Sequence, residues 1–311
     1  MPSELPLISV VLCTYNGEKF LAEQLDSILV QTYSNLELII SDDQSTDGTW
    51  PLLQTYAGKD ARIKLFRNET NLGYNKHFEK ACSFASGQWI AIADQDDIWL
   101  PHKLWALYHG TRADTLLVHS YNAEFKNNDP SVTYSNPSRL RFKGNNTQQL
   151  FFYNTISGHT MLFHQKLLKA ALPFPDGVYY DWWLGVNASL QSKVQLIEEP
   201  LVLHRQHEGN ISHIRKELTE KEKNEKFFKG RIATLQAFLH LPKLRPTEKS
   251  LLREFIQLLQ QEGKKKFSWP VFFFFLKHAR TAFYYRQKKP MHFYYFKYSW
   301  KKASMNVKHW T

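Results

Sequence analysis

The chain has 311 residues, of which 43% are hydrophobic and 22% are charged, and its formal net charge at pH 7 is +11. This length leaves room for one large domain with an appendage, or for two domains. Two cysteines are too few for a disulfide framework, and no apolar run approaches the ~20 residues that span a bilayer. Because no leader sequence is visible either, we expect a protein of a reducing compartment without a membrane-spanning helix.

The first hundred residues alternate between strand and helix patterns. β-branched and apolar runs predict strands at 7–15, 36–43, 62–68 and 88–93. Between them, apolar residues at helical spacing predict helices at 18–31, 49–58 and 76–85. Strands and helices that alternate through short connections form a mostly parallel sheet with helices on both faces, so the predicted fold class is α/β.

Three of the predicted strands end in polar clusters, namely CTYNG, SDDQSTDG and DQDD. Ligands of α/β sheets bind beyond the carboxyl ends of the strands, so we expect these clusters to meet at one rim. The chain has neither G-x-G-x-x-G after the first strand nor a G-x-x-x-x-G-K-[ST] loop. A phosphate group would then need another partner, and Mg²⁺ or Mn²⁺ held by carboxylates could serve.

Asp94, Asp96 and Asp97 form the densest of these clusters, directly after the apolar run WIAIA. One or two of these aspartates can hold a metal beside a diphosphate, while another binds a ribose hydroxyl. The alternative is an acidic turn in which Asp96 or Asp97 caps the next helix. The second acidic strand end, SDD, favours a binding site.

The stretch from ISVVLCTYNG to SDDQSTDGT, followed by DQDD, resembles the family 2 glycosyltransferases, which have the GT-A fold. The resemblance extends over residues 6–212 and implies a catalytic domain at 1–212. It implies Mn²⁺ or Mg²⁺ as the cofactor and a nucleotide-sugar as the donor. The residues implied in nucleotide binding are Thr14, Tyr15, Asn16, Asp43 and Asp94. The metal ligands would be Asp96 and Asp97.

A second acidic position lies in the stretch GVYYDWWLGVNAS. Asp181 resembles the general base of the family, which takes the proton of the attacking sugar hydroxyl in a single, inverting displacement. Trp182 and Trp183 would then stack on the acceptor sugar. The alternative is a helix cap at Asp181 with both indoles in the core.

The stretch LVLHRQHEGNIS matches an R-x-H-x-x-N element of many bacterial members of the family. Arg205 would contact the diphosphate and His207 would complete the metal sphere, with Asn210 in the third position. The alternative is a surface loop with a structural histidine. In TISGHTMLF, His159 is a candidate on the acceptor side.

The last third of the chain changes character. Helical patterns at 214–241 and 246–263 predict a helical extension over 213–263, followed by a basic aromatic tail at 264–311. Twelve of the 40 Lys and Arg residues lie within 263–311, together with none of the 29 acidic residues. Such a composition suits an anionic membrane surface; the alternatives are a packed or oligomerising tail and, less favoured, a nucleic-acid contact.

The sequence thus predicts an inverting glycosyltransferase that adds one sugar to a lipid-linked oligosaccharide in bacterial surface polysaccharide synthesis. No Q-x-x-R-W element of processive synthases is present. The DQDD, DWW and RQHxxN set most resembles rhamnosyltransferase-like members, which implies dTDP-rhamnose as the donor. UDP-hexoses, UDP-N-acetylhexosamines and a non-catalytic binding role are the alternatives. We expect a cytoplasmic location, peripheral on the inner face of the membrane, with no nucleic-acid partner and a possible homo-oligomer.

Overall fold

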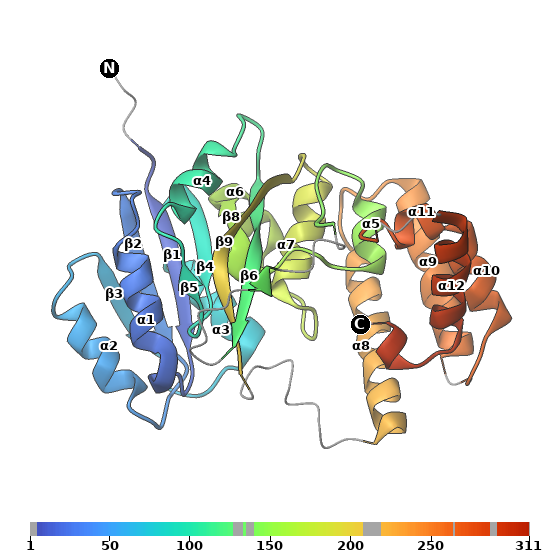
Figure 1. Cartoon of the computed structure of the whole chain (residues 1–311), viewed down its shortest axis with the longest axis horizontal. Coiled ribbons are helices and arrows are strands. Elements are labelled where there is room, and N and C mark those ends of the chain that lie inside the picture. Colours follow the sequence, from blue (N-terminus) through green and yellow to red (C-terminus); the bar gives the residue numbers. More distant parts are fainter. Residues whose placement is uncertain are drawn as a thin grey trace. The chain divides into compact units, whose positions relative to one another are not determined.

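The computed structural model describes residues 5–126, 133–134, 140–207, 219–263, 265–286 and 291–310. The chain divides into two compact units. The first unit comprises residues 1–135 and 156–206, and the second comprises 136–155 and 207–311. The domain boundaries predicted at 212 and 263 stay predictions. Figure 1 shows the α/β character of the first unit and the helical character of the second.

The first unit is built on a nine-stranded mixed sheet. Its strands are β1 (Ile8–Thr14), β2 (Leu36–Asp42), β3 (Ile63–Arg67), β4 (Trp89–Ala93), β5 (Ile98–Trp99), β6 (Leu117–Lys126), β7 (Thr133–Tyr134), β8 (Met161–His164) and β9 (Gln195–Gln206). The strand order is β3-β2-β1-β4-β8-β6-β9-β5, and β7 pairs with β6. The four strands β3, β2, β1 and β4 are parallel, with Ile8 opposite both Leu36 and Trp89.

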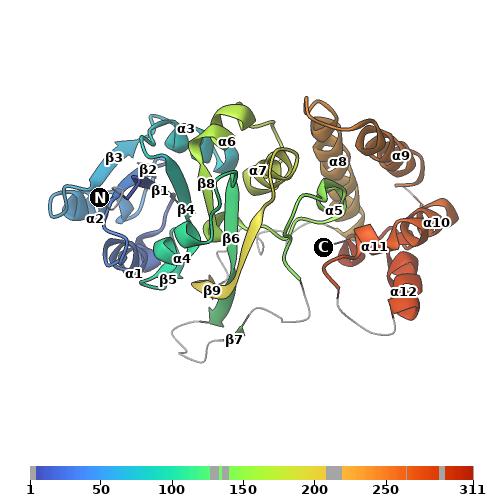
Figure 2. The ribbon, with the colours of Figure 1, turned by 90° about the horizontal axis from the view of Figure 1, so that it is seen from above.

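Helices cover both faces of this sheet, which explains why β1, β2 and β4 are buried over their whole length. The helices are α1 (Glu18–Leu29), α2 (Thr49–Ala57), α3 (Tyr74–Ser83), α4 (Lys103–His109), α6 (Gln165–Ala171) and α7 (Tyr180–Ser189). Figure 2 shows α1 and α4 on one face and α3, α6 and α7 on the other. On the first of these faces, Leu21, Leu25 and Leu104 pack on alternate residues of the strands.

The predicted α/β fold is confirmed, because each strand and helix expected in the first hundred residues is present. The prediction at 36–43 corresponds to Leu36–Asp42, and that at 18–31 to Glu18–Leu29. The second half of the sheet differs from the first. β8 runs antiparallel to both β4 and β6, and β5 antiparallel to β9, so the whole sheet is mixed.

The second unit is helical. Its helices are α5 (Thr147–Phe152), α8 (Glu220–Leu239), α9 (Pro246–Glu262), α10 (Trp269–Lys277), α11 (Ala279–Ala282) and α12 (Met291–Ala303). A capping box between Thr219 and Glu222 begins α8. A ring cluster forms the core, in which Phe255 packs 5.3 Å from Phe152 and 5.1 Å from Phe274.

Part of the predicted tail belongs to this core. Phe274, Phe275 and Trp310 are at most 5% exposed, and the ring of Phe275 lies 5.2 Å from that of Trp310. Some residues of the predicted tail are therefore packed in the core of the second unit, and others are exposed. Lys264, Lys288 and Lys289, which belong to the predicted anionic-membrane tail, lie outside the described residues. No helix in the part of the chain that the structure describes is long and apolar enough to cross a membrane.

At the amino ends of the strands, a buried carboxylate ties three segments together. Glu37 accepts hydrogen bonds from the Ser9 hydroxyl (2.5 Å), from the Ser86 amide (2.8 Å) and from Lys64 Nζ (2.6 Å). Burial alone would raise the pKa of Glu37, but these donors outweigh it and lower the pKa to about 2. Ser9 Oγ in turn accepts from the Gly87 amide at 2.8 Å.

We predict that Glu37→Gln lowers the free energy of unfolding at pH 7 by about 2 kcal/mol, because the charge-assisted bonds are lost. The folded-state pKa of Glu37 lies below the unfolded value, so this stabilisation is present above pH ~4.5 and is lost as the pH falls toward 2. Urea unfolding at pH 7 and at pH 3 measures both effects. A difference between wild type and variant that is the same at both pH values would contradict this account.

Candidate functional site

The polar ends of β1, β2 and β4 meet at one edge of the sheet. The Gln95 side chain bridges two of them, because its Oε1 accepts from the Tyr15 amide (2.9 Å) and its Nε2 donates to the Tyr15 carbonyl (3.1 Å). Thr14 Oγ1 donates to Asp42 Oδ1 at 3.0 Å, and Asp42 is completely buried. The three clusters therefore converge as expected.

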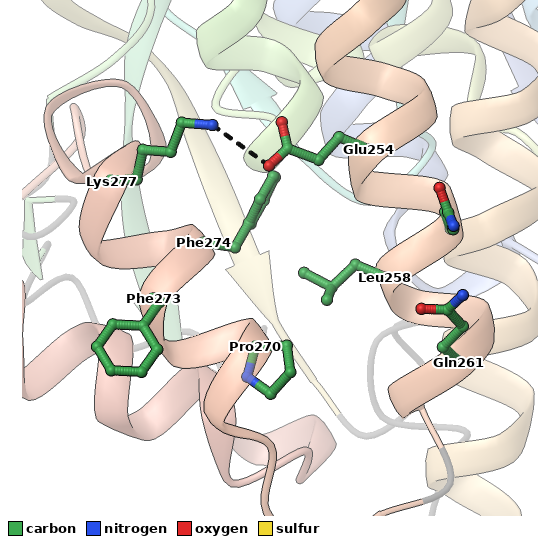
Figure 3. A pocket seen from close by; sticks show the side chains of 8 residues that line it. Glu254, Leu258, Gln261, Pro270, Phe273, Phe274 and Lys277 are labelled. Atoms are coloured by element: carbon green, nitrogen blue, oxygen red, sulfur yellow. Dashed lines mark hydrogen bonds and ion pairs between the residues drawn. The ribbon is translucent and has the colours of Figure 1, made fainter.

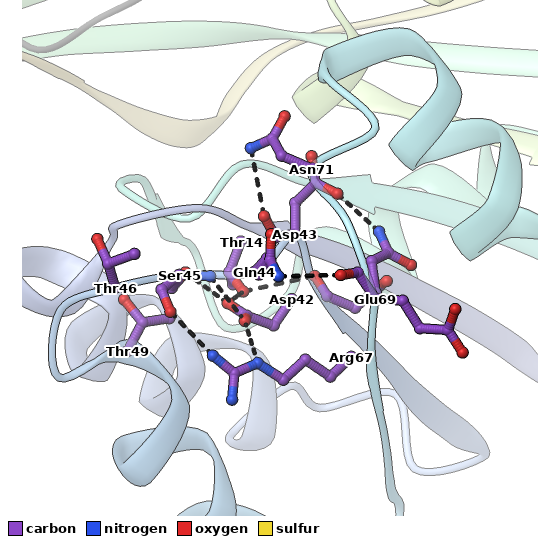
Figure 4. A network of polar contacts seen from close by, with 12 residues as sticks. Thr14, Asp42, Asp43, Gln44, Ser45, Thr46, Thr49, Arg67, Glu69 and Asn71 are labelled. Atoms are coloured by element: carbon purple, nitrogen blue, oxygen red, sulfur yellow. Dashed lines mark hydrogen bonds and ion pairs between the residues drawn. The ribbon is translucent and has the colours of Figure 1, made fainter.

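The loops after β1 and β2 are joined by hydrogen bonds. Figure 4 shows the polar network around the β2 loop, from Asp42 to Thr46, with Arg67 and Asn71. The Ser45 hydroxyl accepts from the Asn16 amide at 2.9 Å, and Asn16 Oδ1 accepts from the Thr46 amide at 2.9 Å. Asn16 and Gln44 have φ values of 49° and 65°, in the left-handed region that costs a non-glycine residue energy. These bonds hold a backbone conformation that the isolated loops would rarely adopt.

Asp43, predicted to bind the base, serves in this structure as the anchor of the 68–73 loop. Its carboxylate accepts from Asn68 Nδ2 (2.7 Å) and from the amides of Leu72 (2.9 Å) and Gly73 (3.0 Å). The side chain is buried. A carboxylate has about four acceptor positions, so one remains for a base, and the predicted role stays a prediction.

A carboxylate–imidazole cluster lies at the end of β4. One ligand atom from each of Asp94, Asp97 and His159 lies within 4.8 Å of the others. His159 Nδ1 is 3.2 Å from Asp94 Oδ2 and 3.8 Å from Asp97 Oδ2. His159 belongs to the short helix η1 (Gly158–Thr160), which precedes β8, the neighbour of β4 in the sheet. Sheet pairing thus brings together groups that are 65 residues apart.

The two aspartates of this cluster differ in their surroundings. Burial raises the pKa of Asp97 to about 8, with further contributions from the charges of Asp94 and Asp96 that His159 opposes. Burial also acts on Asp94, but its bond to His159 holds the pKa below the usual range. The pKa of His159 is raised, because the two carboxylates outweigh its burial. The cluster therefore favours positive charge at its centre.

These residues fit a divalent cation. Asp97 Oδ2 is buried without a hydrogen-bond partner, Asp94 is partly exposed, and His159 Nδ1 is the ring nitrogen that both carboxylates approach. Carboxylate oxygens are ligands that Mn²⁺ and Mg²⁺ prefer, and an imidazole nitrogen is compatible with Mn²⁺. Of the three predicted metal ligands, Asp97 belongs to this group. The side chains of Asp96 and His207 do not belong to it, and Asn210 lies outside the described residues.

Arg205, predicted to contact a diphosphate, is only 1% exposed. Its guanidinium lies between the rings of Phe20 and Phe125, 4.5 Å from each centroid, and its Nη2 is 2.7 Å from Glu23 Oε2. Its Nε donates to the Asp96 carbonyl at 3.0 Å, and its backbone N–H donates to Asp97 Oδ1 at 3.2 Å. This geometry favours a structural role, in which β9 holds the DQDD turn.

Asp181, the predicted base, lies at the first turn of α7 and is half-buried. Its Oδ1 accepts from the Trp182 amide at 2.6 Å, and the Gly158 amide also donates to the carboxylate. Burial raises the pKa of Asp181 to about 7, and the charge of Asp94 contributes in the same direction. A carboxyl group with this pKa can accept a proton near neutral pH.

The indoles of Trp182 and Trp183 are less than 10% exposed, and Trp183 Nε1 donates to the Ala171 carbonyl at 2.7 Å. Stacking on an acceptor sugar stays a prediction that this burial does not favour. Tyr74 and Tyr179 offer exposed rings instead, 6.4 Å apart and 37% and 47% exposed. The hydroxyl end of Tyr74 is buried, 3.4 Å from the Tyr180 hydroxyl, and this burial raises its pKa, with smaller contributions from the charges of Asp94 and Asp181.

The sequence analysis missed Lys103 and Tyr180. Lys103 is completely buried in α4, and its Nζ donates to the His159 carbonyl at 2.7 Å while lying 3.1 Å from the centroid of the Trp99 ring. Tyr180 packs on Gly158 so closely that a Cβ there would lie 2.0 Å from its hydroxyl. The only signal for Lys103 was its position four residues before Leu107, on the apolar face of the helix.

The cluster that fits a metal and the half-buried Asp181 both lie at the carboxyl edge of the α/β sheet, where ligands of such sheets bind. Residues 9–172 match the family described as Glycosyl transferase family 2. The chain belongs to this family. The GT-A fold and the glycosyltransferase activity expected from the sequence are thereby supported.

Two relatives illustrate the range of the family. The chain is 32% identical over 223 residues, 68% of its length and 76% of the relative's, to an uncharacterised glycosyltransferase of Methanocaldococcus jannaschii. It is 40% identical over 182 residues, 58% of its length and 69% of the relative's, to WfgD of Escherichia coli. WfgD is named UDP-Glc:alpha-D-GlcNAc-diphosphoundecaprenol beta-1,3-glucosyltransferase.

Two solved structures share the fold. Residues 1–349 of Staphylococcus aureus TarS in complex with UDP-GlcNAc superpose with a TM-score of 0.63 at 18% identity, covering 95% of this chain and 90% of that one. The mannosyltransferase PcManGT of Pyrobaculum calidifontis, in complex with GDP-Man and Mn²⁺, gives a TM-score of 0.55 at 19% identity, covering 99% and 88%.

We predict that Arg205→Met lowers the free energy of unfolding by about 2 kcal/mol or more, because Glu23 and the Asp96 carbonyl lose a buried charged donor. Glu23→Gln is the matched variant, since it keeps the guanidinium and weakens one of its bonds. It should give a smaller loss in the same direction. Urea unfolding measures both. Unchanged stability of the Arg205 variant, combined with weaker binding of a nucleoside diphosphate, would instead support the predicted diphosphate contact.

Proposed function

We propose that this protein is an inverting, metal-dependent glycosyltransferase that moves a single sugar from a pyrimidine nucleotide to a lipid-linked saccharide. The observation that carries the proposal is the cluster of Asp94, Asp97 and His159, with Asp181 near enough for the charges of Asp94 and His159 to shift its pKa. One edge of the sheet thus offers both a site for diphosphate charge and a proton acceptor.

The predicted nucleotide residues support this proposal by their placement. Thr14 ends β1, and its carbonyl accepts from the Asp43 amide at 2.8 Å. Tyr15 and Asn16 follow in a loop whose conformation is held by hydrogen bonds. Tyr15 is 49% exposed, so its ring is available to a base. The remaining acceptor position of Asp43 suits the N3–H that uracil and thymine share, which leaves the choice between them open.

Two donor sugars are proposed, each on a different ground. The DQDD, DWW and RQHxxN resemblance implies dTDP-rhamnose and a rhamnosyltransferase-like protein. UDP-glucose is the second candidate, because it is the donor named for WfgD, to which this chain is 40% identical over 182 residues. Both sugars would leave with a nucleoside diphosphate.

Asp94, Asp97 and His159 would hold the divalent cation, with Mn²⁺ or Mg²⁺ as the proposed cofactor. When bound, the cation neutralises negative charge that develops on the leaving diphosphate. Lys103 orients the group by holding the His159 carbonyl, and Arg205 does so by fixing the DQDD turn. Asp181 accepts the proton of the attacking hydroxyl, and the displacement inverts the anomeric carbon.

The acceptor is proposed to be an oligosaccharide linked to a lipid diphosphate, in the synthesis of a bacterial surface polysaccharide. The acceptor in the name of WfgD, GlcNAc-diphosphoundecaprenol, supports this class. Such a substrate lies in a membrane, so we propose that the protein works at the cytoplasmic face of the bilayer. Tyr74 and Tyr179 are the exposed rings available to the acceptor sugar.

A donor screen tests this function. UDP, dTDP, UDP-glucose and dTDP-rhamnose are each added with Mn²⁺, and thermal unfolding is followed together with sugar transfer to a short-chain polyprenyl diphosphate saccharide. We expect one pyrimidine nucleotide to raise the melting temperature only with metal present. If no pyrimidine nucleotide stabilises the protein under any metal condition, the proposal fails.

We predict that Asp97→Asn abolishes Mn²⁺-dependent stabilisation by the nucleotide, because a buried metal-binding oxygen is replaced. Asp96→Asn is the matched variant from the same turn and should retain most of that stabilisation, since its side chain is outside the cluster. The melting temperature is measured with nucleotide, with and without Mn²⁺ and EDTA. The reverse pattern would assign the metal to Asp96.

We predict that Asp181→Asn lowers kcat by about 10²–10⁴ while nucleotide affinity changes little. Because the pKa of Asp181 is about 7 and the base must be deprotonated, wild-type kcat/KM should fall as the pH drops below about 7. The variant should lose this dependence. Asp176→Asn, an exposed carboxylate nearby in sequence, is the control. Parallel collapse of nucleotide binding in the Asp181 variant would indicate a structural cap.

A further inference from the structure

Helices α10 and α12 of the second unit present a set of large aromatic side chains to solvent. We call it the aromatic surface, and it consists of Trp269, Phe273, Phe293, Phe296 and Trp300. These five side chains are between 45% and 63% exposed. Soluble proteins expose single apolar residues routinely, whereas contiguous exposed apolar patches are typical of interaction surfaces.

Four of the five rings are linked by ring contacts, and Phe293 lies one turn before Phe296 on α12. Trp269 lies 5.8 Å from Trp300 and 6.1 Å from Phe273 between ring centroids. Buried Phe272 lies beneath them, 5.2 Å from Phe296 and 6.0 Å from Trp300. Rings from two separate helices are therefore side by side, and a flat partner can contact several of them at once.

The exposed rings occupy particular faces of their helices, while neighbouring positions are buried. On α10, Trp269 and Phe273 are one turn apart, while Phe274 and Phe275 point into the core and are at most 5% exposed. On α12, Phe293, Phe296 and Trp300 share one face by their i, i+3, i+7 spacing, while Ser299, Lys302 and Ala303 are the buried residues of this helix. Large rings are therefore exposed on both helices, and α10 buries other rings at the same time.

The charges around the aromatic surface are positive. Lys297 and Lys301 alternate with its rings on α12, Arg280 follows α10, and all three are exposed. Residues 263–311 contain no Asp or Glu. On the α9 side lies a groove of about 350 Å³ that Phe273 lines together with Pro270 and Phe274. Figure 3 shows Glu254, Leu258 and Gln261 of α9 across this groove, with the Glu254–Lys277 ion pair at one end.

We infer that the aromatic surface docks on an anionic phospholipid bilayer, with its rings at headgroup depth and Lys297 and Lys301 against lipid phosphates. Indole and phenyl rings favour this depth, and each basic residue near the surface adds to the attraction. A second copy of this chain fits less well, because it would bring two positive surfaces together. The inference deepens the proposed function by naming the surface that would bring the site to a lipid-linked acceptor.

The test uses the full chain and vesicles of phosphatidylglycerol and phosphatidylcholine in equal parts, without donor or acceptor. We expect wild type to sediment with these vesicles and less with phosphatidylcholine alone. Trp269→Ser/Phe273→Ser/Trp300→Ser should lower the partition coefficient by about tenfold for each ring removed. Val30→Ser, which changes a 62% exposed side chain of the first unit, is the control and should bind like wild type.

Charge is tested separately from insertion. Lys297→Gln/Lys301→Gln should weaken binding by up to about fivefold per residue, and high salt should reproduce this loss. Lys226→Gln/Lys229→Gln on α8 is the matched control and should have no effect. Lipids brominated near the headgroup should quench wild-type tryptophan fluorescence, and this quenching should be lost in Trp269→Phe/Trp300→Phe although that variant still binds.

Point variants are used because deletion of 264–311 would remove core residues such as Phe274. Circular dichroism and nucleotide-dependent stabilisation, both expected to match wild type, verify folding. The inference is overturned if wild type does not bind anionic vesicles, or if the serine variant binds as wild type does. It is also overturned if the serine substitutions instead dissociate an oligomer or abolish binding to single-stranded RNA. Failure of the donor screen would leave this result unaffected.

Discussion

Asp94 and Asp97 lie at the end of a buried strand, and both approach the same nitrogen of His159. Two carboxylates brought this close in a poorly solvated place repel each other and lose hydration, so the fold must supply compensating charge and donors. His159 supplies part of it, and the Arg205 amide another part. The result is that the pKa of Asp94 is lowered while that of Asp97 is raised. A divalent cation would compensate both carboxylates, which is why the cluster fits one.

Much of the surrounding polar chemistry holds this arrangement in place. Lys103 holds the backbone of His159, and Arg205 holds the DQDD turn from β9. Gln95 and Asp43 do the same for the loops after β1 and β3 through backbone amides. Many polar groups near the strand ends are therefore used within the protein. Asp97 Oδ2, which is buried without a hydrogen-bond partner, and the exposed side chain of Tyr15 differ from them.

The second unit follows a different principle. α10 buries the rings of Phe272, Phe274 and Phe275 and exposes those of Trp269 and Phe273. α12 buries Ser299, Lys302 and Ala303 and exposes the rings of Phe293, Phe296 and Trp300. Exposed rings gathered from two helices are typical of a surface that binds a partner. Because this region is positively charged, a negatively charged partner fits it best.

Local pattern determined much of this protein. The strands and helices of the first hundred residues could be predicted from apolar periodicity, which depends on neighbours along the chain. The meeting of the acidic strand ends at one edge could be predicted because the carboxyl ends of parallel strands lie together in an α/β sheet. Only the tertiary structure decided which side chains meet. His159 joins Asp94 through the pairing of β8 with β4, whereas the side chain of Asp96 is outside the cluster. Arg205 is enclosed by Phe20 and Phe125. The separation of buried Phe274 from exposed Phe273 likewise depends on the helices packed around α10, because composition carries no information about which face of a helix finds a neighbour.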